Sequence, residues 1–218
     1  MPGQFNKPSL TIEQQLAHLR DAGMIIADEQ RARHWLSHVS YYRLSGYWHI
    51  WKDRSGRQTR FLPGTHFDLV CDLYSFDRKL RRLVARATEH VEVALRGSWA
   101  YVLAHEGGAH GYLNAALYAD RRAFHELLAK LAREAGTSPE TYIRHYRENY
   151  DDPAIPPVWM VAEMMTFGQL SRWVSLLDDR ALRSQIARPF NLPETVLIAT
   201  IKHLVDVRNI CAHQGRLW

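Results

Sequence analysis

Apolar residues recur at helical spacing along most of the chain, and no useful length alternates apolar and polar residues as a half-buried strand would. The strongest pattern begins after Asp68, which we expect to be an N-cap, and continues to about residue 104. A helix of that length is expected to bend or break near Gly97. The pattern predicts an all-α fold. Its apolar members are Leu69, Leu73, Phe76, Leu80, Leu83, Val84, Ala87, Val91, Ala94, Leu95 and Trp99.

Capping and turn signals divide the rest of the chain into shorter helices. Thr11 and Gln14 have the spacing of a capping box, and a second helix is expected to start at Asp28. Ser138 is the expected cap of a later helix. Further helices are predicted at residues 120–135, 140–150, 158–166, 170–177 and 180–188, and from Pro193 onward.

Polar stretches separate these helices. Residues 1–8 are expected to be an unstructured lead, and residues 52–66 a basic loop or small hairpin. The proline-rich residues 151–157 are expected to form an internal loop, because the composition does not change beyond them. We therefore predict one domain over residues 1–218, in which the long helix packs against the terminal helix.

Composition favours a soluble protein with an anionic partner. The hydrophobic fraction of 46% excludes a disordered chain, and the formal charge of +5 is mildly basic. No signal segment is present and no run approaches about 18 apolar residues, so we expect a cytoplasmic protein without a membrane partner. Cys71 and Cys211 give neither a disulfide framework nor a zinc signature. His34 and His38 have a metal-ligand spacing but lack a third ligand, so no metal or other cofactor is expected.

Candidate chemistry gathers in the last fourteen residues, where Arg208, Asn209 and His213 lie close together. Arginine matches phosphate oxygens, and histidine can exchange a proton near neutral pH. Asn209 and His213 share a helix face, whereas Arg208 and His213 diverge by roughly 140° on an ideal helix. The long Arg208 side chain must therefore reach around the helix to meet His213, or the helix must unwind near Gly215. Alternatively, the partner residue comes from a second chain. The alternative is an ordinary helix end, where His213 and Arg216 complement the dipole and Gly215 closes the last turn.

Two other groups are candidates for RNA contact. Arg78, Arg82 and Arg86 repeat every four residues and would form a basic stripe, although a solvated helix face explains the same spacing. Tyr42 and Arg43 belong to an aromatic stretch at residues 40–51 that could stack on bases. Helically spaced aromatic residues more often fill a core, and we interpret most of that stretch in this way.

The string from Arg208 to His213 has the R-x4-6-H form of HEPN ribonuclease domains. Together with the following R-L-W, it resembles the end of the domain in the Abi family (AbiD/AbiF-like) of abortive-infection proteins. Four other segments resemble that family in the same order, so the resemblance covers nearly the whole chain. They are Ser40–Tyr47 (SYYRLSGY), Leu73–Arg81 (LYSFDRKLR), Glu92–Arg96 (EVALR) and Phe167–Ser171 (FGQLS).

The resemblance implies a HEPN-like helical domain with metal-independent endoribonuclease activity, used as an antiphage or toxin effector. Arg208 would hold the phosphoryl oxygens, His213 would move a proton, and Asn209 would orient the imidazole or bind phosphate. Glu92 and Arg96 would lie near that site. The resemblance also implies a homodimer with paired motifs, and an antitoxin, either RNA or protein, as a further partner.

Two alternatives remain beside the nuclease. One is a non-catalytic RNA-binding module, such as an immunity partner held by a cognate RNA. The other is a helical protein-interaction domain whose terminal arginine and histidine only cap a helix. Members of the family commonly continue past the R-L-W segment, whereas this sequence stops at Trp218, so we expect the C-terminal tail to be absent.

Overall fold

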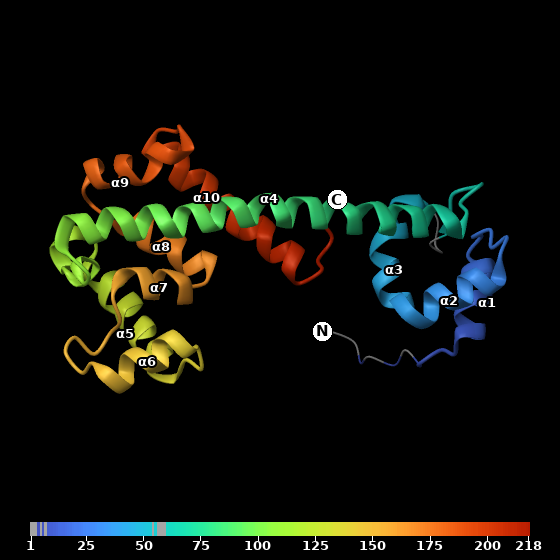
Figure 1. Cartoon of the computed structure of the whole chain (residues 1–218). Coiled ribbons are helices and arrows are strands. Elements are labelled where there is room, and N and C mark those ends of the chain that lie inside the picture. Colours follow the sequence, from blue (N-terminus) through green and yellow to red (C-terminus); the bar gives the residue numbers. More distant parts are fainter. Residues whose placement is uncertain (1–3, 5, 7, 54, 56–59) are drawn as a thin grey trace. The chain divides into compact units, whose positions relative to one another are not determined.

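The computed structural model describes residues 4, 6, 8–53, 55 and 60–218, and Figure 1 shows that helices dominate them. The all-α prediction is confirmed, because the described strands form only one antiparallel pair, β1 (Lys52–Asp53) and β2 (Arg60–Phe61). The α-helices are α1 (Ile12–Asp21), α2 (Glu29–Val39), α3 (Tyr41–Trp48), α4 (Phe67–Gly107), α5 (Arg121–Thr137), α6 (Thr141–Asn149), α7 (Val158–Met164), α8 (Phe167–Leu176), α9 (Arg180–Ala187) and α10 (Glu194–Ala212). Short 3-10 turns lie at His49–Trp51, Gly111–Leu113, Ala115–Leu117 and Arg188–Phe190.

The contacts divide the chain into two compact units. The first unit comprises Met1–Arg82 together with Arg216–Trp218, and the second comprises Leu83–Gly215. The division falls within α4, which contributes residues to both units. The proline-rich loop at residues 151–157 lies inside the second unit.

Local capping explains how the helices of the first unit begin. Thr11 and Gln14 form the expected capping box at the start of α1, and the Asp28 side chain accepts a hydrogen bond from the Arg31 amide at the start of α2. A basic loop or a small hairpin was expected for residues 52–66, and the antiparallel pair β1–β2 forms a small hairpin there. Of the predicted lead, residues 1–3, 5 and 7 lie outside the described residues, and residues 4, 6 and 8 have no regular structure.

The aromatic stretch forms α3 and fills much of the core of the first unit. Tyr47 and Trp48 are buried, and the Trp48 ring makes edge contacts with Tyr41 and Phe61. The interpretation of this stretch as core is therefore confirmed for its inward face. Tyr42 points the other way and is 89% exposed.

Two predictions about the long helix are wrong in detail. α4 begins at Phe67, so Asp68 lies in its first turn instead of at the N-cap. The helix also continues through Gly97 to Gly107, so of the expected bend or break the break does not occur, and the bend stays a prediction. Glycine lowers helix stability by only about 1 kcal/mol, and the buried neighbours Leu95 and Trp99 hold this part of α4 in the core of the second unit.

The core of the second unit is built on aromatic rings. Trp173 of α8 contacts Trp99 of α4, and the rings of Tyr112, Tyr118 and Phe124 surround it within 5.4–6.1 Å. Burial raises the pKa of Tyr112 and Tyr118, whose hydroxyls donate to the carbonyl oxygens of Pro156 and Tyr112, respectively. These hydrogen bonds satisfy polar groups that would otherwise destabilise the core.

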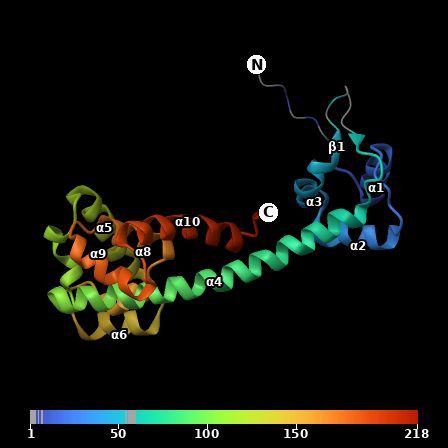
Figure 2. The ribbon, with the colours of Figure 1, turned by 90° about the horizontal axis from the view of Figure 1, so that it is seen from above.

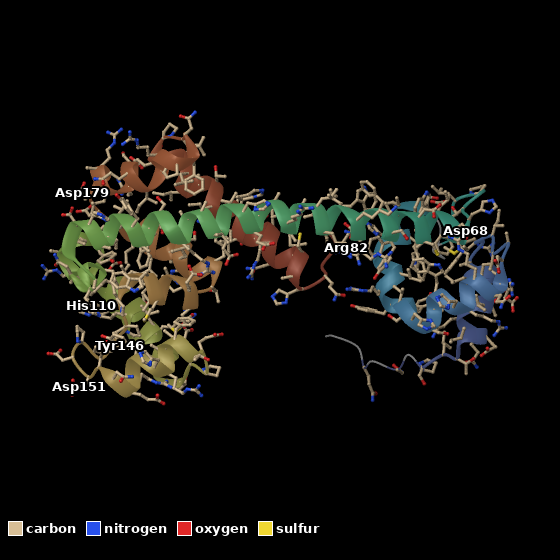
Figure 3. The ribbon with its side chains drawn as sticks, in the orientation of Figure 1. Asp68, Arg82, His110, Tyr146, Asp151 and Asp179 are labelled. Carbon is tan, nitrogen blue, oxygen red and sulfur yellow. The ribbon has the colours of Figure 1, made fainter. Side chains whose placement is uncertain are left out.

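His110, Tyr146 and the already described Tyr112 bind the carbonyl oxygens of the proline-rich loop. Tyr146 of α6 donates to the Pro153 carbonyl at 2.7 Å, and its oxygen lies 3.3 Å from His110 Nε2 (Figure 3). His110 Nε2 also contacts the Ile155 carbonyl oxygen at 3.0 Å. The loop is thus packed by specific hydrogen bonds, as expected for an internal connection.

Two short helices begin at other residues than predicted. α6 begins at Thr141, and Ser138 accepts the Glu140 amide without capping the helix. α8 begins at Phe167, because Thr166 and Gln169 form a capping box there. The predicted junction at residues 167–168 is therefore the first turn of α8.

Candidate functional site

The terminal helix α10 is held along one side by the core of the second unit. Leu197 and Ile201 are buried, and α10 packs chiefly against α8 and α9 (Figures 1 and 2). The apolar face of α10 therefore anchors the helix in the core, and the predicted motif lies at the C-terminal end of this helix. α10 also meets α4 of the same unit through Glu92 and Arg208, so the long helix contacts the terminal helix as expected.

The last turn of α10 closes by backbone hydrogen bonds around His213, which is the C-cap. The Gly215 amide donates to the Ile210 carbonyl at 2.8 Å, and the Gln214 amide donates to the Cys211 carbonyl at 3.2 Å. This is the pattern of a Schellman motif. Gly215 closes the turn as expected, but the left-handed residue is Gln214, with a φ of 55°.

Arg208 lies between α10 and α4 in a small pocket. Its Nε is 3.7 Å from Glu92 Oε2, and its Nη1 donates to Asn209 Oδ1 at 3.3 Å. The pocket has a volume of about 290 Å³ and is lined by Ala85, Glu89, Glu92, Arg208, Cys211 and Ala212. The Arg208 side chain is 38% exposed, so the guanidinium is held by an acid and yet open to solvent.

Glu92 connects this pocket to the interior of the second unit. Its Oε1 accepts a hydrogen bond from Arg96 Nη2, and its side chain is only 14% exposed. Arg96 Nη1 donates to the carbonyl oxygens of Ala162 and Glu163 in the last turn of α7. Arginine at a helix C-terminus satisfies free carbonyls and complements the dipole. Arg96 therefore fixes Glu92, and Glu92 faces Arg208.

His213 stands apart from this network. Its side chain is exposed, and its imidazole forms no hydrogen bond or ion pair within the described part of the chain. The structure thus brings Arg208, Asn209 and Glu92 together and leaves His213 open. This agrees with the divergence of positions 208 and 213 around one helix.

A model of the Abi-like protein family matches residues 34–218, which include all the residues of this pocket. The chain belongs to the Abi-like family. Searches of the curated proteins and of the solved structures found no match.

The arginine stripe of this Abi-like protein is exposed on α4. Arg78, Arg82 and Arg86 are all open to solvent, and none forms an ion pair with another described residue (Figure 3 labels Arg82). In the segment of α3 that resembles the family, Arg43 is half-buried beside the exposed Tyr42. These five residues make up the predicted RNA-binding set, and the structure describes all of them.

The pocket of the Abi-like protein contains two residues that the sequence analysis missed, Glu89 and Cys211. Helical spacing contained a signal for Glu89, because it lies three residues before Glu92 and so shares its face of α4. The spacing of Cys211, three residues after Arg208, gave a similar signal on α10.

No group of three or more potential metal-ligating side chains occurs among the residues that the structure describes. The rings of His34 and His38 are tilted by 30° with their centroids 4.2 Å apart, and His38 Nδ1 donates to the His34 carbonyl. None of the described helices combines the length and apolar character needed to cross a lipid bilayer.

Proposed function

We propose that this Abi-like protein is a metal-independent endoribonuclease that acts as an abortive-infection or toxin effector. The observation that carries the proposal is the guanidinium of Arg208, held at a pocket by Glu92 and Asn209, about one helical turn before the exposed His213, whose imidazole has no hydrogen-bond partner among the described residues. Membership of the Abi-like family supports the biological role. The exposed Tyr42, Arg78 and Arg82 of the first unit and Arg86 of the second unit are aromatic and cationic side chains of the kind that bind RNA.

The proposed reaction needs only a cation and a group that exchanges a proton. The 2′-hydroxyl of the substrate attacks the adjacent phosphorus, its proton is removed, and the bond to the 5′-oxygen breaks as that oxygen gains a proton. The products are a 2′,3′-cyclic phosphate and a 5′-hydroxyl. His213 exchanges one of these two protons, and Arg208 stabilises the charge that builds on the phosphoryl oxygens.

Glu92 and Asn209 prepare the arginine for that role. The carboxylate lies 3.7 Å from Arg208 Nε, which is an ion-pair distance longer than a hydrogen bond, so Glu92 attracts the guanidinium without saturating its N–H donors. Asn209 Oδ1 holds one terminal nitrogen of the guanidinium. A restrained arginine loses less conformational freedom when it binds a planar pair of phosphate oxygens.

We further propose that the active unit is a homodimer, in which the ends of the two α10 helices face each other. An uncovered stripe on α10 supports this proposal: Val196 and Ile210 are 45% and 37% exposed, and His203 lies midway between them at intervals of seven residues. Ile210 precedes His213 by three residues, so the stripe leads to the imidazole. A second copy on this stripe would bring its Arg208 towards the His213 of the first chain.

Incubation of the pure protein with total RNA in EDTA tests the nuclease. We expect cleavage by the wild type, and His213→Ala and Arg208→Ala should each lower the rate by about 10²- to 10⁴-fold. His105→Ala is the matched control, because His105 is exposed on α4 and, among the described residues, contacts Tyr101 through its carbonyl and its ring. Cleavage that requires added Mg²⁺ would contradict the mechanism. RNA binding without cleavage would favour a binding partner, and neither activity would favour an interaction module.

Mixing the Arg208→Ala chain with the His213→Ala chain tests the dimer. A composite site predicts that mixed dimers regain part of the activity, because one of their two sites keeps both residues. A wild-type chain that has the mass of a monomer at the assay concentration and is fully active would contradict the dimer.

A further inference from the structure

The first unit contains a pocket between α1 and the start of α3. It has a volume of about 760 Å³, which lies within the range of ligand pockets, and its surface is mostly apolar. None of the described residues that line it is acidic, so an anionic polymer meets no like charge in its wall. The lining residues include Leu10, Gln15, His18, Ser40, Tyr41 and Tyr42.

Two adjacent tyrosines give this pocket an inner wall and an exposed rim. The Tyr41 ring is partly buried, and its centroid lies 4.9 Å from that of Trp48 and 6.3 Å from that of His18. Tyr42 is the next residue of α3, about 100° further round the helix, and it is 89% exposed. The core therefore holds Tyr41, whereas the Tyr42 ring is open to a ligand.

The backbone at Ser40 sets the direction of both rings. Ser40 has φ 72° and ψ 147°, a conformation that a residue with a Cβ rarely adopts. Its Oγ accepts a hydrogen bond from the Arg43 amide and so caps α3 directly after the turn from α2. Such backbone persists where the surrounding structure fixes it, and it is frequent at ligand-binding sites. α3 thus begins at the pocket, with both tyrosines in its first turn.

Gln15 of α1 supplies a polar atom without a partner. Its Nε2 donates to the Leu10 carbonyl at 2.9 Å, which fixes the orientation of the amide. Its Oε1 is buried and accepts no hydrogen bond from any described residue. Buried polar atoms are rarely left unpaired. This oxygen is therefore suited to a donor group of a ligand, such as the imino or amino group of a nucleobase.

The positive charge of the chain is concentrated in the unit that contains this pocket. The first unit has 14 Lys and Arg residues against 8 Asp and Glu, whereas the second unit has 14 against 15. The formal excess of cations therefore belongs entirely to the first unit. RNA is a polyanion with planar bases, so this charge and the exposed Tyr42 ring complement its two main chemical features.

We propose that the first unit binds single-stranded RNA and that this pocket accepts one unstacked nucleobase, with Tyr42 as the stacking ring. Bases of a single strand can turn outward, whereas those of a duplex are stacked and paired. The proposal goes beyond the nuclease, because the pocket belongs to the other unit and uses none of the residues around Arg208. It rests on the proposed function only in taking RNA as the ligand.

Binding of a fluorescent oligouridylate to the full chain tests the stacking ring. The parent is His213→Ala, so that the RNA stays intact if the protein is a nuclease. We expect Tyr42→Ala to lower the affinity by about 5- to 100-fold, and Tyr42→Phe, which keeps the ring, to bind like the parent. The salt slope should stay unchanged, because no phosphate contact is lost. Tyr101→Ala is the matched control, since Tyr101 is 65% exposed but lies in the second unit.

Photocrosslinking locates the bound base without reference to activity. Thiouridine in the same oligonucleotide should crosslink to residues that line the pocket, such as Leu10 or Tyr41, and less so in Tyr42→Ala. An RNA duplex, or the same strand with abasic sites, cannot place a base in the pocket. Each of these two ligands should therefore bind Tyr42→Ala and its parent equally.

The outcomes separate the base pocket from the nuclease. Unchanged affinity in Tyr42→Ala, an equal loss in Tyr101→Ala, or crosslinks only in the second unit would overturn the proposal. Because Tyr42 is exposed, Tyr42→Ala should unfold at the same temperature as its parent, and thermal unfolding checks this. A wild type that binds RNA through this pocket without cleaving it would reject the nuclease and retain the base site. A wild type that cleaves RNA, with binding indifferent to Tyr42, would do the reverse.

Discussion

α4 carries two buried acid–arginine pairs with the same spacing, and the two have different surroundings. Asp77 and Arg81 lie in the first unit, and Glu92 and Arg96 lie in the second. In each pair the acid precedes the arginine by four residues, which is the favourable order in a helix. In each pair the arginine also finds a further partner, Tyr47 Oη for Arg81 and the end of α7 for Arg96.

The pairs differ in what the second carboxylate oxygen contacts. Oδ1 of Asp77 is occupied by two backbone amides, whereas Oε2 of Glu92 faces the guanidinium of Arg208 across 3.7 Å. Asp77 is therefore a closed polar junction, and Glu92 borders an open pocket. The comparison shows that a local ion pair becomes part of a candidate site when one carboxylate oxygen faces a partly exposed cation of another helix.

Removal of the closed junction should have the largest effect on stability. Asp77→Ala leaves Arg81 buried without its acid, so we expect a loss of about 3–5 kcal/mol of unfolding free energy in urea titrations. The control Asp72→Ala alters an exposed acid on the same helix and should change stability by less than about 0.5 kcal/mol. Equal effects of the two substitutions would show that the junction adds no stability.

Neutralisation of the open pair should affect activity more than stability. Glu92→Gln keeps the shape of the side chain but removes the charge that faces Arg208, and we expect RNA cleavage to slow by about tenfold, or about 1.4 kcal/mol in activation free energy. Glu89→Gln is the matched control, because Glu89 lines the same pocket and forms no ion pair with a described residue. If both variants cleave at the wild-type rate, Glu92 does not orient Arg208.

Three exposed arginines of α4 form no ion pair with another described residue and complete the comparison. Arg78, Arg82 and Arg86 have Tyr74, Arg78 and Arg82 four residues before them, so none has an acid at the position that Asp77 and Glu92 occupy before Arg81 and Arg96. Reversal of all three charges should weaken RNA binding severalfold and reduce the salt slope by about one unit per lost phosphate contact. Binding isotherms at several salt concentrations measure this slope. An unchanged slope would mean that the stripe is only a solvated face.

The smallest effect is expected at the end of α10. Gln214 adopts a left-handed conformation that costs a residue with a Cβ roughly 1 kcal/mol, and glycine adopts it freely. Gln214→Gly should therefore stabilise the protein by about 0.5–1 kcal/mol in thermal unfolding. A loss of stability would show that the Gln214 side chain contributes more than the strain costs.

The sequence by itself determined the features that depend on neighbours within four residues. The capping box of Thr11 and Gln14, the pair of Glu92 and Arg96, and the grouping of Arg208 with Asn209 were all predicted, because each forms within one or two turns of a helix. The same capping signal at Thr166 and Gln169 marks the true start of α8, which apolar spacing placed too late. The missing break at Gly97 shows the limit of local rules, since packing of α4 outweighs the cost of one glycine.

Tertiary structure decided which of these local features meet. Asp77 accepts amides from residues 140 and 141 positions away, and nothing in the spacing of Asp77 and Arg81 distinguishes it from an exposed helix pair. Arg208 likewise owes its place to Glu92 on another helix, whereas His213 lies exposed at the C-cap of α10. Contacts between distant segments depend on the packing of whole helices, and hydrophobic burial, which drives that packing, is non-directional. The residue pattern therefore predicted the candidate chemistry, and the packing determined which groups contact it.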